Sequence, residues 1–416
     1  MAVAPPFLVA LNLTERCNLR CAHCYLDAGT RRRGGPAELA TAEVTRILDS
    51  IATLGDETMV VLTGGEPLLR PDIFAIARHA ASLGLTVVMG TNGTLLDDAR
   101  VAALVKAGVS AVGISLDSLD PGYHDRFRGR AGAWGKTMAG IDACRRGGLM
   151  VQLHFTVTDD NAGELDGMIA FAGSVGAVLL NVFFVVCTGR GQSLTNVSPE
   201  VHERVLIRVA EAARDETRVM VRARCAPHFK RLALAITPPL AVTLADGYEA
   251  GGCLAGTRYC RVTPSGELTP CPYMAASAGS LRETDFATLW REAPLFGTLR
   301  APHLEGRCGD CEYARLCGGC RARPLARSGN LMGEDFLCTY QPQGGGTVEA
   351  ISETGASLAW SAEAEARLRR VPAAVRRFVR RRAEGHVRAL GERRVTAEHL
   401  DALARHRFGD RLPMRP

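Results

Sequence analysis

Lysine is almost absent from this 416-residue chain, in which Lys106, Lys136 and Lys230 are the only lysines among 50 basic residues. Aromatic residues are also scarce, at 6%. No apolar run is long enough to cross a bilayer, and the opening residues lack the basic start and long apolar stretch of a signal peptide. The lack of a membrane span and of a signal peptide argues against a membrane or secreted protein, and a cytoplasmic location is expected.

Cysteine, by contrast, is abundant, with 14 residues. In a reducing compartment, so many cysteines are more typical of metal ligands than of disulfides. Three lie between positions 17 and 24, and eight lie between positions 253 and 338. The other three, Cys144, Cys187 and Cys225, show no ligand spacing and are expected to be core or free thiols.

Short apolar runs alternate with segments of helical periodicity through the first half of the chain. Six runs are expected to form strands, at Phe7–Leu13, Met59–Leu62, Thr86–Gly90, Ala111–Leu116, Met150–Val157 and Val178–Val186. Strand–helix units in series predict an α/β fold with a parallel sheet wound in one direction, hence a partial (β/α)6 barrel. In such folds ligands gather at the C-terminal ends of the strands.

After about residue 215 this rhythm stops, and residues 250–342 are rich in Cys, Gly and Pro. The expected domains are the barrel at 1–215, a cysteine-rich domain at 216–343, a flexible glycine-rich linker at 344–358 and a small all-α tail at 359–416. Because a segment with few long periodic runs cannot build a large core, bound metals would stabilise the cysteine-rich domain.

Cys17, Cys21 and Cys24 directly follow the first expected strand. A loop can wrap three thiolates around one metal cluster, which a regular helix or strand cannot do. Three ligands leave a four-iron cluster with one open iron, where a chelating substrate can bind. A zinc loop is the alternative, but it needs a fourth ligand and none is nearby. The spacing of these cysteines resembles the signature of the radical S-adenosylmethionine (SAM) superfamily.

A second motif, Gly64-Gly65-Glu66-Pro67, follows the second expected strand. It resembles the loop of that superfamily that holds the amino group of SAM. In this interpretation, the two glycines let the backbone come close to SAM, and Glu66 supplies negative charge.

Further polar residues follow the third and fourth expected strands. By the same resemblance, Asn92, Ser115 and Asp117 would contact the ribose and carboxylate of SAM. Arg128 lies in a segment that often offers an arginine toward SAM, and an ordinary surface arginine is the alternative.

The resemblance also implies the chemistry. One electron enters the cluster, whose open iron is chelated by SAM, and cleavage of a carbon–sulfur bond gives methionine and a 5′-deoxyadenosyl radical. That radical removes a hydrogen atom from the substrate, while the protein supplies positioning and excludes water. An electron donor such as flavodoxin or ferredoxin is therefore an expected partner.

The eight cysteines of the second half suit two clusters with four cysteines each. Their arrangement resembles the SPASM domain, an extension of radical SAM enzymes that carries two auxiliary four-iron clusters. The resemblance implies one cluster on Cys253, Cys260, Cys271 and Cys320, and another on Cys308, Cys311, Cys317 and Cys338.

Two residues precede Cys320 where that family usually has three, so the assignment of Cys260 and Cys320 stays open. A zinc ribbon is the alternative, with ligands Cys308, Cys311, Cys317 and Cys320. It would leave the other four cysteines unexplained.

Short segments around these cysteines resemble the radical SAM enzymes that tailor hemes. The segments are Thr257–Arg261, Thr269–Tyr273, Cys317–Arg323 and Gly333–Asp335, with Thr188–Gly191 after the sixth expected strand. That group includes the decarboxylase that makes heme from iron-coproporphyrin, the didecarboxysiroheme deacetylase and the enzyme that trims side chains in d-type heme synthesis. A tetrapyrrole is therefore the expected substrate.

Two other functions remain open. One is a maturase that modifies a ribosomal peptide or an enzyme or metal-cofactor protein. Such enzymes often carry a leader-binding domain, for which there is no room before Cys17, although the tail could recognise a peptide. The other is a non-catalytic electron-transfer or iron–sulfur scaffold protein, which would not need SAM motifs. No acid–base residue is assigned, because the expected substrate loops carry no motif.

The tail holds 15 arginines and 7 acidic residues from Ser361 onward, whereas the whole chain has a net charge of +6. Its sequence resembles the small C-terminal domain of light-independent protochlorophyllide reductase. Leu368, Val371 and Val375 predict one helix and Thr396 the start of another. Arginines could pair with tetrapyrrole carboxylates, and docking on this chain or on a partner is the alternative. A solvated helix face is preferred, so no specific nucleic acid is expected.

Overall fold

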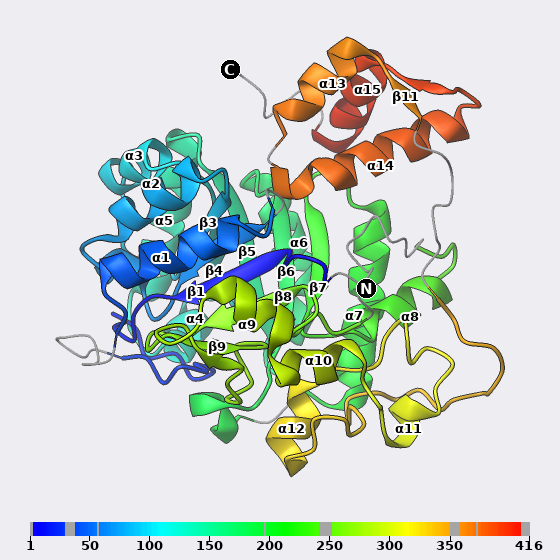
Figure 1. Ribbon diagram of the computed structural model, residues 1–416, viewed down its shortest axis with the longest axis horizontal. Coiled ribbons are helices and arrows are strands. Elements are labelled where there is room, and N and C mark those ends of the chain that lie inside the picture. Colours follow the sequence, from blue (N-terminus) through cyan, green and yellow to red (C-terminus); the bar gives the residue numbers. More distant parts are fainter. Residues whose placement is uncertain are drawn as a thin grey trace.

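The computed structural model describes residues 3–29, 38–55, 58–194, 197–240, 252–349, 358–371 and 373–408. Its centre is a ten-stranded sheet in the order β10-β9-β8-β1-β2-β3-β4-β5-β6-β7 (Figure 1). The strands are β1 (Leu8–Asn12), β2 (Met59–Thr63), β3 (Thr86–Thr91), β4 (Val109–Ser115), β5 (Met150–Val157), β6 (Leu179–Phe184), β7 (Met220–Arg224), β8 (Tyr259–Val262), β9 (Glu267–Thr269) and β10 (Gly279–Ser280).

The strands β8 and β1 to β7 are neighbours that all run parallel. The helices between β1 and β7 are α1 (Thr41–Ala52), α2 (Ile73–Ser82), α3 (Asp98–Lys106), α4 (Pro121–Arg128), α5 (Ala133–Arg146), α6 (Leu165–Ser174) and α7 (Pro199–Asp215). The six expected strands are confirmed to within two residues at each end. The α/β partial barrel is therefore the observed architecture.

The sheet extends further than the sequence predicted. β7 follows the expected end of the barrel near residue 215 and pairs with β6, while β8, from the cysteine-rich region, pairs with β1. Both strands are short, and two of the five residues of β7 are arginines. A search for apolar runs in the sequence does not detect such a strand.

Successive strand residues point to opposite faces of the sheet. One set, which includes Leu11, Leu62 and Leu153, packs in the fully buried main core. The other set forms the inner face of the partial barrel. In β2 and in the first five residues of β5 the burial pattern alternates, and residues such as Gln152 of β5 and Arg222 of β7 on the inner face are partly exposed. The inner face is therefore accessible, as a binding site requires.

The cysteine-rich region continues the sheet through the antiparallel strands β9 and β10. Its helices are α8 (Phe229–Ala235), α9 (Phe286–Glu292), α10 (Pro294–Arg300), α11 (Gly306–Gly309) and α12 (Ala322–Ser328). Trp290 of α9 and Phe296 of α10 are fully buried in the main core, and the Trp290 indole donates to the Ala4 carbonyl at 2.9 Å. This region is thus packed against the barrel.

The tail, drawn in orange and red in Figure 1, has its own small core of Ala364, Ala383, Val387 and Val395. It contains β11 (Ala359–Trp360), α13 (Ala362–Arg369), α14 (Ala373–Ala389), β12 (Arg394–Val395) and α15 (Ala397–Phe408). The single helix expected through Leu368 and Val375 is two helices, and a two-stranded ladder joins β11 to β12. The tail is therefore mainly, but not entirely, helical.

The expected linker is only partly free of the cysteine-rich region. The amide of Val348 donates to the Glu312 carbonyl at 2.8 Å, and Glu349 pairs with Arg315. Residues 350–357 of that prediction lie outside the described residues, and its last residue, Leu358, packs against the core of the tail. None of the described helices is long and apolar enough to span a bilayer.

Candidate active site and cysteine clusters

Cys17, Cys21 and Cys24 lie in the loop after β1, at the C-terminal edge of the parallel sheet. They pack in one small cluster with Leu19, Leu26, Ala28 and Ala133. The amide of Cys17 donates to the Gly29 carbonyl at 2.8 Å, which closes the loop. The structure thus brings the three thiols together on irregular backbone, as a loop that wraps a cluster requires.

The Gly64–Pro67 loop packs directly against this cysteine loop. The amide of Gly65 donates to the Thr14 carbonyl at 2.7 Å. A Cβ atom at Gly65 would lie 2.2 Å from the Arg16 carbonyl oxygen, and Gly64 has φ +145°. Both positions therefore need glycine, because any side chain would push the two loops apart.

Glu66 is fully buried at the start of the short 3₁₀ turn Pro67–Leu69. Its carboxylate accepts hydrogen bonds from the Thr91 hydroxyl at 2.9 Å and from the backbone amide of Asn92 at 2.9 Å. Burial raises the pKa of Glu66 to about 7. A cationic group such as an ammonium would stabilise the ionised form at this position.

Asn92 connects the end of β3 to the cysteine loop. Its side-chain nitrogen Nδ2 donates to Asn18 Oδ1 at 2.8 Å and lies 3.9 Å from Cys17 Sγ. Ser115, at the end of β4, is partly exposed and lies in register with His154 of β5. Both residues are thus at the C-terminal edge, where the sequence placed them.

Asp117 and Arg128 form a buried ion pair. Although burial disfavours its charge, Asp117 has a lowered pKa because the Arg128 guanidinium stabilises the carboxylate. Arg128 also donates to Cys21 Sγ at 3.5 Å. The alternative of an ordinary surface arginine is therefore wrong, since the Asp117–Arg128 pair supports the cysteine loop from within.

The Thr188–Gly191 segment after β6 also packs on the cysteine loop. Arg190 donates to the Cys21 carbonyl at 2.9 Å and pairs with Asp27 at 2.6 Å. A Cβ atom at Gly189, which has φ +57°, would lie 2.5 Å from the Cys24 carbonyl oxygen. The loop after β6 therefore supports the cysteine loop at Cys21, Cys24 and Asp27.

A second group of thiols consists of Cys225, Cys253, Cys271 and Cys320, which share a buried cluster separate from the main core. Burial raises the pKa of Cys271 well above its usual value, and the nearby Cys253, Cys320 and Cys225 raise it further. Tyr25, next to Cys24, and Tyr273, close to Cys271, have ring centroids 5.6 Å apart. The second group thus lies near the first cysteine loop.

Cys260 does not join this group, which corrects the ligand set expected from the sequence. It lies on β8 in register with Val9, points to the helix-covered face and is fully buried in the main core. Its neighbour Arg261 takes the inner face instead. Because strand residues alternate, Cys260 cannot turn toward Cys253 without slipping the register of β8.

Cys225 takes the place that the sequence gave to Cys260. It directly follows β7 and has φ +57°, a left-handed conformation that is uncommon outside glycine. Its carbonyl accepts a hydrogen bond from the buried Arg323. Cys225 therefore lies among the thiols of the second group, and no spacing rule could find it there, since 27 residues separate it from Cys253.

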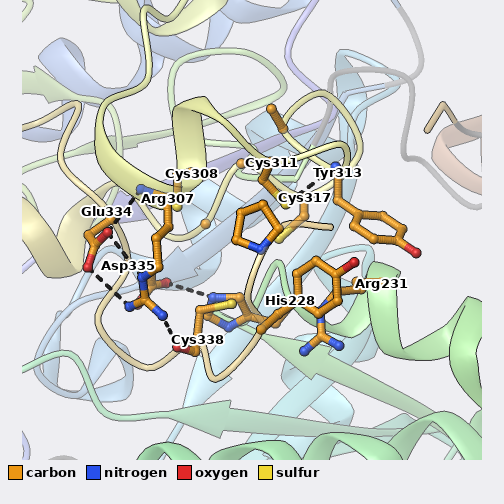
Figure 2. A pocket seen from close by; sticks show the side chains of 15 residues that line it. His228, Arg231, Arg307, Cys308, Cys311, Tyr313, Cys317, Glu334, Asp335 and Cys338 are labelled. Atoms are coloured by element: carbon orange, nitrogen blue, oxygen red, sulfur yellow. Dashed lines mark hydrogen bonds and ion pairs between the residues drawn. The ribbon is translucent and has the colours of Figure 1, made fainter. Parts of the chain in front are cut away.

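A third group of thiols is formed by Cys308, Cys311, Cys317 and Cys338, which line one pocket with His228 and Asp335 (Figure 2). Gly318 and Gly319 have φ +60° and +68°, so the chain turns sharply after Cys317. Cys320 consequently joins the second group, and two intervening residues suffice where the resemblance implied three.

Asp335 lies between the second and third groups. It is fully buried and accepts hydrogen bonds from the Cys320 amide at 2.8 Å and from Arg323 at 2.8 Å. Burial alone would raise the pKa of this carboxyl, but Arg323, His228 and the backbone amides of Cys320 and Leu337 together lower it, so the carboxylate is ionised. The Arg323–Asp335 pair therefore ties the two groups into one rigid unit.

The zinc ribbon expected as the alternative is not formed, because Cys320 lies apart from Cys308, Cys311 and Cys317. Among the described residues, no three Cys, His, Asp or Glu side chains converge on a single metal-ion position. One group of three thiols and two groups of four do match the ligand numbers of iron–sulfur clusters, the first with an open iron.

Comparison with known proteins agrees with this geometry. Residues 11–172 match the Radical SAM superfamily, and residues 253–320 match the SPASM iron–sulfur cluster-binding domain. The AdoMet-dependent heme synthase of Methanosarcina barkeri is 40% identical over 344 residues, which are 81% of this chain and 97% of that protein. The chain belongs to the radical SAM superfamily.

A second relative, a solved structure and a match to the tail add to this comparison. The pre-heme d1 synthase of Dinoroseobacter shibae is 32% identical over 83% of this chain and 89% of that protein. The crystal structure of SuiB from Streptococcus suis bound to S-adenosylmethionine shares the fold, with a TM-score of 0.66 at 18% identity over 81% of this chain and 78% of that chain. Residues 360–403 match the proto-chlorophyllide reductase 57 kD subunit.

The family establishes that the chain is an enzyme that uses a [4Fe-4S] cluster and SAM, and its SPASM region supports auxiliary iron–sulfur clusters. A non-catalytic carrier is therefore the wrong alternative. The heme-tailoring resemblance is confirmed by the relatives, which include heme synthases and a pre-heme d1 synthase.

Proposed function

We propose that this radical SAM enzyme removes or alters carboxylate side chains of a tetrapyrrole, with iron-coproporphyrin as the first candidate. The observation that carries the proposal is the 40% identity to an AdoMet-dependent heme synthase over 97% of that protein's length. The match also covers 81% of this chain. When bound, the open cluster supplies the electron that cleaves SAM to methionine and a 5′-deoxyadenosyl radical.

We assign the cofactor contacts from the geometry. The catalytic cluster is held by Cys17, Cys21 and Cys24, and the auxiliary clusters by Cys225, Cys253, Cys271 and Cys320 and by Cys308, Cys311, Cys317 and Cys338. Gly64 and Gly65 let the backbone approach SAM, and Pro67 starts the turn that holds Glu66. Glu66 faces the SAM amino group, while Asn92 and Ser115 contact the ribose and carboxylate.

Two residues keep a supporting role in this proposal. Asp117 and Arg128 are buried and paired, so they orient the Cys21 loop and set the local charge at the SAM site. An electron carrier such as flavodoxin or ferredoxin supplies the reducing electron.

A peptide or protein substrate is the second candidate function. The PqqA peptide cyclase of Granulibacter bethesdensis is 28% identical over 85% of this chain and 92% of that protein. That identity is lower than the 40% of the heme synthase, so the tetrapyrrole is preferred.

The test is mass spectrometry of anaerobic reactions that contain reconstituted enzyme, SAM and dithionite. Separate reactions contain iron-coproporphyrin, didecarboxysiroheme or no substrate, and both 5′-deoxyadenosine and the tetrapyrrole are measured. We expect a substrate-dependent rise in deoxyadenosine with loss of carboxyl mass from iron-coproporphyrin. Deoxyadenosine formed while both tetrapyrroles keep their mass would contradict the proposal and favour a peptide or protein substrate.

A further inference from the structure

The inner face of the partial barrel carries positive but no negative charge. None of the strands β1 to β8 contains an aspartate or glutamate. Three arginines alternate onto the inner face, Arg222 and Arg224 of β7 and Arg261 of β8. A cationic lining is the expected complement of an anionic substrate.

Arg224 is held in a fixed orientation. Its Nε atom donates to Asn181 Oδ1 of β6 at 2.7 Å, and the Asn181 amide reaches Gln152 Oε1 of β5 at 3.4 Å. The guanidinium is therefore oriented by three neighbouring strands before any ligand arrives. Preorganisation of this kind lowers the entropy cost of binding a carboxylate.

Arg261 is more buried and makes different hydrogen bonds. It donates to the Thr269 hydroxyl and to the Pro272 carbonyl, both at 3.0 Å, and is only 7% exposed. Its contacts connect β8 to β9 and to the segment after Cys271. Arg224, at the partly exposed C-terminal end of β7, is the better placed of the two for a ligand.

Aromatic side chains lie beside Arg224. Phe183 of β6 is in register with Arg224, and its ring centroid is 5.2 Å from that of His154 of β5. His154 is in register with Ser115, which we assign to SAM. Burial, together with the nearby charge of Arg224, lowers the pKa of His154 to about 4, so the imidazole is neutral near pH 7. Two flat, uncharged rings, one apolar and one an imidazole, thus lie between a fixed cation and the SAM site.

A macrocycle with carboxylate side chains matches this arrangement. We propose that Arg224 binds a carboxylate of the tetrapyrrole substrate on the inner face, with Phe183 and His154 against the macrocycle. The inference rests on the proposed function and adds a residue and a subsite to it. A guanidinium can bind a carboxylate through two hydrogen bonds. Such a contact would hold the substrate at a fixed position relative to the SAM site beside Ser115.

The test is an anaerobic titration with iron-coproporphyrin III in the presence of SAM and without reductant, followed by the Soret absorbance. We expect Arg224→Gln to raise the dissociation constant at least tenfold and Arg224→Lys to raise it less. Arg208→Gln is the matched control, because Arg208 lies on α7 outside the barrel and pairs with Asp166. The control should bind as tightly as the wild type.

A second titration uses the tetramethyl ester of iron-coproporphyrin III in detergent micelles. Because the ester lacks carboxylates, the wild type and Arg224→Gln should bind it equally if Arg224 recognises a carboxylate. Iron content and the far-ultraviolet circular dichroism spectrum of each variant check folding, and Arg224→Lys keeps the test decisive if the glutamine variant does not fold.

The outcomes separate the two proposals. If the wild type converts iron-coproporphyrin but folded Arg224 variants bind it with unchanged affinity, the inference about Arg224 is wrong and the proposed function stands. If the variants weaken the acid and the ester alike, the effect is structural and the carboxylate subsite is wrong. A wild type that neither binds nor converts a tetrapyrrole overturns both.

Discussion

Cys225 occupies a backbone conformation that costs free energy. Its φ of +57° lies in the left-handed region, which costs an L-residue about 1–2 kcal/mol. Such strain persists where the surrounding structure enforces it, and here the bond from Arg323 to the Cys225 carbonyl does so. The strained turn points the thiol toward Cys253 and Cys271 while Arg224, one residue earlier, lies on the inner face.

This arrangement predicts opposite results for two cysteines. Cys225→Ala should lose the iron and sulfide of one auxiliary cluster. Cys260→Ala should keep all clusters and lose only core packing, with a decrease in unfolding free energy on the order of 1 kcal/mol. Iron and sulfide analysis with electron paramagnetic resonance of the reduced protein checks both. Iron loss in Cys260→Ala with full iron in Cys225→Ala would restore the ligand set expected from the sequence.

The helix α5 shows at the scale of an element how close packing serves the SAM site. Gly140 is buried, and a Cβ atom there would lie 2.3 Å from the Gly93 carbonyl oxygen in the loop after β3. The same loop contains Asn92, whose carbonyl accepts a hydrogen bond from the Thr137 hydroxyl at 3.0 Å. The small residue therefore lets α5 hold the loop that contacts the first cysteine group.

Two alanine substitutions in α5 should thus change the stability of the fold in opposite directions. Gly140→Ala should weaken SAM binding and destabilise the fold by about 1–3 kcal/mol, because the loop must move. Gly135→Ala meets nothing within 4 Å, so it should stabilise the helix by about 0.5 kcal/mol and leave SAM affinity unchanged. Thermal unfolding and calorimetric SAM binding measure both, and equal effects at the two positions would contradict this account of α5.

The whole molecule consists of a barrel with a docked cysteine-rich region and a tail that has a core of its own. In the tail, the Trp360 indole donates to Glu384 at 3.0 Å, and the Arg380 guanidinium lies 4.4 Å from the centroid of the Trp360 ring. The charge of Arg380 is paired with Glu365. These contacts stay within the tail, so part of its arginine excess is neutralised internally. The catalytic part should not need the tail to fold.

A chain that ends after Glu349 tests this independence. We expect it to keep the full iron content and the SAM cleavage rate of the complete chain, because Glu349 is the last described residue that contacts the cysteine-rich region before the tail. A selective loss of tetrapyrrole affinity would assign the tail arginines to the substrate. Loss of iron would instead show that the tail stabilises the clusters.

Much of the fold and site could be predicted because the signals are local. The spacing of Cys17, Cys21 and Cys24 specifies a wrapping loop, and apolar runs such as Met150–Val157 specify buried strands wherever they pack. The order of these segments along the chain then implies a parallel sheet with its ligands at the C-terminal edge.

Tertiary structure decided whatever depends on convergence of distant segments. Cys225 becomes a neighbour of Cys253 only because β7 joins the sheet beside β6, and Cys260 is excluded because β8 pairs with β1 in one register. The burial of Asp117 and the placement of Arg224 beside Phe183 follow from the same sheet. A sequence records which side chains are present, but the direction of each one is set by strand alternation and register, which form only on folding.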